Sequence, residues 1–96
     1  MRDQALKRDS GKLQMELIPP STLISLGKVL TYGADKYSPH SWKKVEKERY
    51  IGAILRHLVK YMEDNSSIDN ESGLLHIEHV LANACFLNDM QFNWSD

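Results

Sequence analysis

Apolar side chains recur at helical spacing in the middle of the chain. They occupy positions i, i+3, i+4, i+7 and i+11, namely Ile51, Ile54, Leu55, Leu58 and Met62. An α-helix of 3.6 residues per turn brings such positions to one face. The pattern therefore predicts an amphipathic helix from about Glu46 to Asp64.

A pair of prolines marks the start of an earlier helix. The pair Pro19-Pro20 ends the preceding segment, because proline disfavours helical backbone at the residue before it. Ser21 or Thr22 can then cap a helix whose apolar residues continue to about Lys36. Residues 37–42, with the sequence Tyr-Ser-Pro-His-Ser-Trp, are expected to form an irregular loop.

A third helical segment follows a break at residues 65–67, which read Asn-Ser-Ser. We expect Asn70 or Ser72 to cap this helix and the helix to end at about Met90. No stretch alternates apolar and polar residues over a useful length, so strands are not expected. The sequence predicts an all-α fold, a small bundle of three main helices.

The length of the chain limits its core. A single domain of 96 residues buries a modest fraction of its surface, and oligomerisation is the usual remedy. We therefore expect a homo-oligomer that completes the bundle, with the helical domain over residues 18–96. Residues 1–17 are mixed and polar, and they form either an arm that docks on a neighbouring subunit or a frayed tail.

The charge balance excludes some partners. The chain has 12 basic and 13 acidic residues, a formal net charge of −1, whereas proteins that coat nucleic acid polymers or anionic membranes need a basic excess. The single Cys85 favours a reducing compartment. The charged N-terminus is unlike a signal peptide, and no apolar stretch approaches a membrane span. We expect a cytoplasmic protein, in the host cell if it is phage-encoded.

A polar stripe interrupts the third helical segment. His76, His79 and Asn83 are spaced i, i+3 and i+7 and share a face. Burying such a stripe without partners is costly, so we expect it to face a cavity, a partner chain or a ligand. Histidines at i and i+3 can converge on zinc, but a structural zinc site needs four ligands. Hydrogen bonding to a base, sugar or phosphate is therefore the favoured interpretation.

Basic residues on the second helix suggest a phosphate contact. Arg56 and Lys60 are i, i+4 neighbours, and both side chains bind phosphates in proteins. The alternative is a solvated face with ion pairs to Glu63 or Asp64. His57 lies on a different side of the helix, where a structural role is the simpler interpretation.

Two loops add further candidates. Residues 69–73 precede a helix N-terminus, which suits a phosphate, although the acids Asp69 and Glu71 could act as caps or hold Mg²⁺ or a ribose hydroxyl. Trp42 lies beside Lys36 and Lys43 in sequence and could stack on a purine. The alternative for Trp42 is a side chain that closes over the helix bundle.

Linked motifs run along the chain from about residue 11 to residue 90. They are Gly11-Lys12, Leu17-Ile18-Pro19-Pro20, Leu30-Thr31-Tyr32-Gly33-Ala34-Asp35-Lys36-Tyr37, Trp42, Arg56-His57, Asp69, Glu71-Ser72-Gly73-Leu74, His76-x-x-His79 and Asn83. In this order they resemble the small phage-associated family named for the N-terminal domain of dATP/dGTP diphosphohydrolases. The resemblance implies a helical domain, a phage or prophage origin and purine nucleotide ligands.

The resemblance also makes the matching polar positions candidates for a ligand site. They are Lys36, Trp42, Arg56, His57, Glu71, Ser72, His76, His79 and Asn83, and Lys60 joins them through its spacing to Arg56.

The carboxylates bear on whether such a site cuts its ligand. Hydrolysis at an α-phosphate generally needs divalent metals held by carboxylates. No acid occurs between Arg49 and Met62, the interior of the third helix has only Glu78 before Asp89, and no His-Asp dipeptide is present. The acids therefore favour binding over cleavage.

Our main hypothesis is a protein that binds and sequesters a purine nucleotide, such as a host defence signal or a cyclic nucleotide, without cofactor and without cleavage. The alternative is a metal-dependent dATP/dGTP diphosphohydrolase that releases pyrophosphate, using Mg²⁺ or Mn²⁺ held by Asp69 and Glu71. A helical interaction module without a small ligand is a third interpretation. The sequence leaves open whether the protein is an enzyme.

Overall fold

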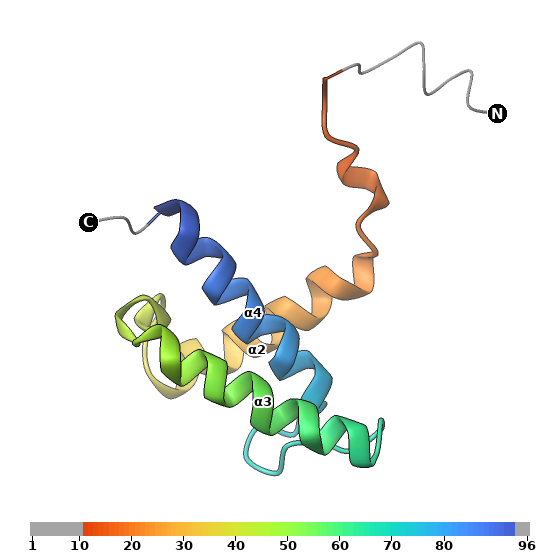
Figure 1. Ribbon diagram of the computed structural model, residues 1–96, viewed down its shortest axis with the longest axis vertical. Coiled ribbons are helices and arrows are strands. Elements are labelled where there is room, and N and C mark those ends of the chain that lie inside the picture. The colour runs from red at the N-terminus through yellow and green to blue at the C-terminus, as the bar shows by residue number, and fades with distance from the viewer. Residues whose placement is uncertain (1–10, 94–96) are drawn as a thin grey trace, which may run out of the picture.

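The computed structural model describes residues 11–93, apart from the side chains of Trp42 and Asn93. Three main helices make up the described chain, α2 (Pro20–Lys36), α3 (Lys47–Glu63) and α4 (His76–Asn93), with short 3-10 turns η1 (Met15–Leu17) and η2 (Ser41–Lys44) (Figure 1). The predicted all-α class is confirmed. Oligomerisation stays a prediction.

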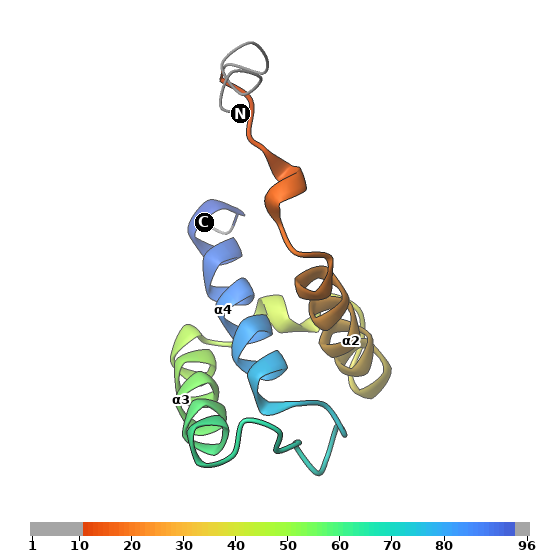
Figure 2. The ribbon, with the colours of Figure 1, turned by 90° about the vertical axis from the view of Figure 1, so that its right-hand side faces the viewer.

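Helix α4 lies between the other two helices. It packs against α3 on one side and against α2 on the other, and Figure 2 shows this order clearly. The segment before α2, from Gly11 to Pro19, leads away from the three helices (Figures 1 and 2). Residues 1–10 of the predicted N-terminal arm lie outside the described residues, so the arm and the boundary at residue 18 stay predictions.

The core is small, as the chain length predicts. Within residues 11–93 its buried apolar members are Val29, Tyr50, Ala82 and Phe86. The rings of Tyr50 and Phe86 lie 5.0 Å apart at 50°, a tilted arrangement that favours aromatic pairs. This contact joins the first turn of α3 to the middle of α4.

The apolar face of α3 is only partly covered. Ile54 and Leu58 are half-buried, whereas Ile51, Leu55 and Met62 are exposed by 43%, 57% and 73%. Helix α3 therefore presents apolar side chains beyond its contact with α4.

The predicted caps of two helices are wrong. Pro20 is already the first residue of α2, since proline has a helical φ and its missing N–H leaves no helix hydrogen bond unmade there. Neither Asn70 nor Ser72 caps α4, which begins at His76. A carboxylate oxygen of Glu78, at the third helical position, accepts a hydrogen bond from the Leu75 N–H at 3.1 Å. This bond caps the N-terminus of α4.

The segment before α4 is a closed turn. The N–H of Asp69 donates to the carbonyl of Leu74 at 2.8 Å, and the N–H of Gly73 donates to the carbonyl of Asp69 at 2.7 Å. Gly73 has a φ of +74°, a value that glycine adopts without the steric cost met by other residues. These bonds use the backbone groups that a longer helix would need, so α4 starts later than its sequence pattern suggests.

Candidate functional site

Three histidines meet where α3 and α4 pack together. The Nδ1 atoms of His57 and His76 lie 2.8 Å apart. The ring of His57 stacks on the ring of His79, with centroids 4.6 Å apart and planes 11° apart. Because His76 and His79 are each only 8% exposed, the cluster belongs to the interior of the α3–α4 contact.

The polar stripe of α4 is buried along its length. Asn83, which is 9% exposed, donates from Nδ2 to the carbonyl of His79 at 2.7 Å. His76 contacts His57, and His79 contacts both His57 and the loop before α4. The stripe therefore faces other parts of this chain and two pockets, one lined by His76 and the other by His79 and Asn83.

The closed turn places a carboxylate beside the histidines. The N–H of Ser72 donates to Oδ2 of Asp69 at 2.9 Å, and the hydroxyl of Ser72 lies 2.7 Å from Nε2 of His79. Oδ2 of Asp69 is 3.9 Å from the same His79 nitrogen. Ser72 thus fixes the carboxylate and one imidazole relative to each other.

Three of these side chains can point ligand atoms at one position. One ligating atom from each of His57, Asp69 and His76 lies within 4.8 Å of the other two. Two imidazoles and a carboxylate are a common ligand set for divalent transition metals. The sequence pattern had suggested the pairs Asp69–Glu71 or His76–His79 instead, and His79 is engaged with Ser72.

Burial changes the acid–base properties of the cluster. Desolvation lowers the pKa of His57, and the neighbouring His79 and His76 lower it further. Desolvation also lowers the pKa of His79, against the opposing effect of Asp69. Burial tends to raise the pKa of Asp69, but hydrogen bonds from Ser72 outweigh it and the pKa is lowered. The lowered pKa values of His57 and His79 favour their neutral imidazoles, and the lowered pKa of Asp69 favours its charged carboxylate.

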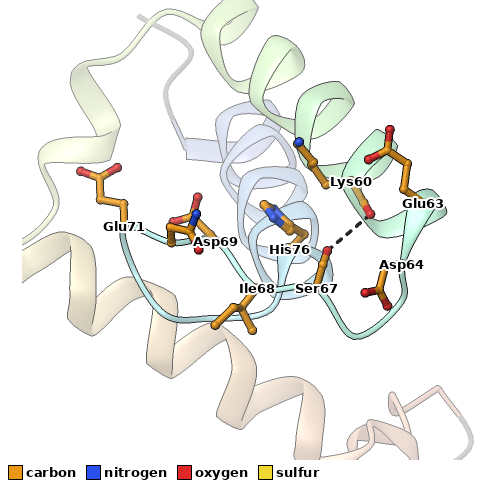
Figure 3. A pocket seen from close by; sticks show the side chains of 9 residues that line it. Lys60, Glu63, Asp64, Ser67, Ile68, Asp69, Glu71 and His76 are labelled. Carbon is orange, nitrogen blue, oxygen red and sulfur yellow. Dashed lines mark hydrogen bonds between the residues drawn. The ribbon is translucent and has the colours of Figure 1, made fainter.

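An open pocket lies beside the cluster, and we call it the loop pocket. It has a volume of about 540 Å³. Its lining comes from the end of α3, the following loop and the start of α4: Lys60, Glu63, Asp64, Ser67, Ile68, Asp69, Asn70, Glu71 and His76 (Figure 3). The hydroxyl of Ser67 donates to the carbonyl of Lys60 at 3.4 Å. The pocket brings one cation and several acids next to two members of the cluster.

A second pocket lies between α2, the 37–41 segment, α3 and α4, and we call it the aromatic pocket. Its volume is about 790 Å³, and its lining includes Tyr32, Tyr37, Tyr50 and Phe86. His79 and Asn83 also line it. His79 thus belongs to the histidine cluster, where it stacks on His57 and lies near Asp69, and it also lines the aromatic pocket.

The remaining predicted site residues lie in other contacts. Lys36 forms an ion pair with Glu71 and lies over the ring of Tyr37, with Nζ 5.1 Å from the ring centroid. Arg56 is exposed, and its guanidinium turns back over Gly52. Lys60 is the member of the basic pair that lines a pocket. The side chain of Trp42 lies outside the described residues, so its predicted stacking role stays a prediction.

Glu78 has a structural role that the sequence pattern left open. It is 6% exposed and accepts a hydrogen bond from the hydroxyl of Ser25 at 2.7 Å. The ammonium of Lys28 lies 3.6 Å from the same carboxylate oxygen. Glu78 therefore ties α2 to α4 and does not face the loop pocket.

Comparison with known proteins places the sequence of this chain in a family. The profile of the family described as "dATP/dGTP diphosphohydrolase, N-terminal" matches residues 2–96. The chain belongs to this family. Membership in the dATP/dGTP diphosphohydrolase N-terminal family confirms the resemblance inferred from the linked motifs.

A relative carries the same name. A protein of Salmonella phage PMBT28, named dATP/dGTP diphosphohydrolase, is 32% identical over 82 residues, which cover 85% of this chain. The chain spans 28% of the length of that relative. No solved structure matches the chain. Across residues 11–93, no helix is long and apolar enough to cross a membrane.

Proposed function

We propose that this chain forms the nucleotide site of a dATP/dGTP diphosphohydrolase and that the histidine cluster lies at the reacting phosphate. The observation that carries the proposal is the meeting of His57, Asp69 and His76 beside a pocket lined by Lys60. Family membership and the name of the phage relative support this substrate class.

The loop pocket suits the phosphate chain of the nucleotide. Lys60 supplies a positive charge for phosphate oxygens, and lysine binds phosphates as a point charge. The acids Glu63 and Asp64 on the same wall would repel a bare polyphosphate, and they become favourable once divalent cations accompany the nucleotide. The triphosphate therefore enters this pocket together with cations.

The aromatic pocket suits the purine. Its tyrosine and phenylalanine rings offer apolar surface for a flat base, and ligand pockets are commonly apolar with a few placed polar groups. Asn83 is such a polar group, because its side-chain amide carries both donors and an acceptor. His79 lies between base and phosphates in this arrangement, which matches its contacts on both sides.

The histidines shift the balance from sequestration to cleavage. Counting carboxylates alone favoured a protein that binds without cutting. The fold adds two imidazoles to one carboxylate, so a cation can be held without a cage of acids. The name of the phage relative also supports hydrolysis over sequestration.

The reaction is the hydrolysis of one phosphoanhydride bond. A water oxygen bonds to the α-phosphorus, and the bond from that phosphorus to the oxygen bridging the β-phosphate breaks. The deoxynucleoside monophosphate and pyrophosphate are released, and the proton of the water passes to the solvent. A bound cation supplies charge neutralisation and lowers the pKa of water. The protein side chains hold the phosphates and orient them.

The test is a product analysis with the purified chain. It is incubated with each of the four deoxynucleoside triphosphates and Mn²⁺ or Mg²⁺, and nucleotides and pyrophosphate are separated by chromatography. We expect dAMP or dGMP and pyrophosphate in equal amounts, from the purine substrates. Recovery of bound but intact nucleotide would support sequestration instead, and the absence of binding in calorimetry would remove both hypotheses.

A pair of lysine variants tests whether the loop pocket binds the phosphates. Lys60→Met removes the cation that lines the loop pocket, so we expect the KM for dGTP to rise about tenfold or more. Lys47→Met is the matched control, because Lys47 is the exposed first residue of the same helix. Equal effects of the two substitutions would place the phosphates elsewhere.

A further inference from the structure

We propose that His57, Asp69 and His76 form a binding site for one divalent first-row transition metal ion, such as Fe²⁺, Co²⁺ or Zn²⁺. The use of this site in hydrolysis rests on the proposed function, whereas its occupancy by metal does not.

The geometry of the ligand atoms carries the proposal. All three ligating atoms lie within 4.8 Å of one another, so a single ion can reach each of them after small side-chain rotations. The Nδ1 atoms of His57 and His76 are 2.8 Å apart. Two nitrogens bound to one ion at about 2.0–2.1 Å lie roughly 3 Å apart, so these rings need to separate only slightly.

The ligands come from three separate segments. His57 lies on α3, Asp69 lies in the closed turn, and His76 is the first residue of α4. The N–H of Ser72 holds Oδ2 of Asp69 at 2.9 Å. Outer hydrogen bonds of this kind fix the orientation of metal ligands in proteins. The carboxylate is therefore positioned before any ion binds.

The site has room for further ligands. Asp69 and His76 both line the loop pocket, and Figure 3 shows their side chains next to each other at its wall. Catalytic metal sites commonly have three protein ligands and leave other positions to water or substrate. Phosphate oxygens in the loop pocket can take these positions.

The donor set selects the class of ion. Imidazole nitrogen suits zinc, iron and nickel, and cobalt lies between iron and nickel in its affinity for such ligands, whereas Mg²⁺, Ca²⁺ and Mn²⁺ suit oxygen ligands. Two of the three ligands are imidazoles. We therefore expect the site to bind Co²⁺ or Zn²⁺ more tightly than Mg²⁺, which separates it from the Mg²⁺ site that Asp69 and Glu71 alone would form.

The test is a Co²⁺ titration of the full chain, purified without a histidine tag and stripped with a chelator. No nucleotide is present, so the visible absorption of bound Co²⁺ reports the site independently of hydrolysis. We expect one Co²⁺ to bind per chain. Zn²⁺ should compete with it, whereas an equal concentration of Mg²⁺ should not. His76→Ala and Asp69→Asn should each weaken binding at least tenfold.

Two control variants make the result specific. His40→Ala removes the fourth histidine, which lies in the 37–41 segment and is not one of the three ligands, and it should leave the Co²⁺ affinity unchanged. Glu71→Gln removes the acid that pairs with Lys36 and should also leave the affinity unchanged. Circular dichroism of each variant shows whether it is folded.

The outcomes separate the two proposals. Wild-type affinity in folded Asp69→Asn, or equal losses in His40→Ala, would overturn the metal site. Specific Co²⁺ binding without any release of pyrophosphate would support the metal site and contradict the proposed hydrolase activity. Hydrolysis that persists in variants unable to bind Co²⁺ would support the proposed hydrolase activity and show that this metal site takes no part in it.

Discussion

The hydroxyl of Ser72 contacts Nε2 of His79 at 2.7 Å, and this contact joins the closed turn to α4. The same hydroxyl accepts a hydrogen bond from the N–H of Leu74 at 3.2 Å. Ser72 therefore stabilises both the shape of the turn and the ring orientation of His79. A small polar residue in a loop here supports the side chains that we assign to the functional site.

Removal of this hydroxyl should be costly. We expect Ser72→Ala to lower the free energy of unfolding by about 1–2 kcal/mol, because it leaves a nitrogen of the buried His79 imidazole without its hydrogen-bond partner. Urea denaturation measures the change. Ser66→Ala is the control, since the Ser66 hydroxyl bonds to Asp64 at an exposed position. A similar loss in both variants would show that the contact with His79 adds nothing specific.

Glu78 should be a major link between helices. Glu78→Ala removes the acceptor for Ser25 and for the Leu75 N–H, so we expect a loss of about 2–3 kcal/mol in thermal or urea unfolding. Glu78→Gln retains an acceptor for the helix end, and its loss should be smaller. If Glu78→Gln were as unstable as Glu78→Ala, the interaction with Lys28 would dominate instead.

Tyr50 gives the protein a predictable response to alkaline pH. Desolvation raises the pKa of its phenol from 10.0 to about 12. Between these values the folded chain keeps a proton that the unfolded chain has lost, so this contribution to stability is present below pH 10 and is lost as pH rises.

The Tyr50→Phe variant isolates this response. We expect the urea midpoint of the wild type to fall as the pH rises from 10.0 to about 12, and the fall to be smaller in Tyr50→Phe. Ultraviolet absorption of phenolate, recorded in the same samples, should show that one tyrosine titrates late in the folded wild type. An equal fall in both proteins would assign the alkaline instability to other groups.

The uncovered side of α3 offers a test of self-association. Leu55 and Val59 are exposed by 57% and 53% and lie one helical turn apart. If a homo-oligomer covers this side, Leu55→Glu combined with Val59→Glu should shift the mass measured by light scattering to that of a monomer. Thr31→Glu, at an exposed position of α2, is the control. A monomeric wild type would contradict the predicted oligomer.

The sequence predicts α2 and α3 well because their signals are local. Helical spacing of apolar residues and the Pro19-Pro20 pair depend only on neighbouring positions, and both helices lie within about two residues of their predicted bounds. The start of α4 could not be found in this way. It depends on hydrogen bonds that close a turn from Asp69 to Leu74, and these compete with the helix for backbone groups.

The site was harder to predict than the fold. Spacing along one helix placed His76 and His79 on a common face, but only the packing of α3 against α4 brings His57 to His76. The same packing and the turn leave Lys60 at a pocket, while Arg56 folds back over its own helix. Convergence of segments distant in sequence has no signature in a single sequence, and the family resemblance supplied the link between them.

The position of His79 has a consequence for ligand binding. Its ring lines the aromatic pocket, stacks on His57 and contacts Ser72 of the turn. A ligand that displaces this ring from one side changes the free energy of binding on the other side, and thermodynamic linkage makes that effect reciprocal. We therefore expect occupation of the aromatic pocket and occupation of the cluster to be coupled, with the imidazole of His79 as the shared element.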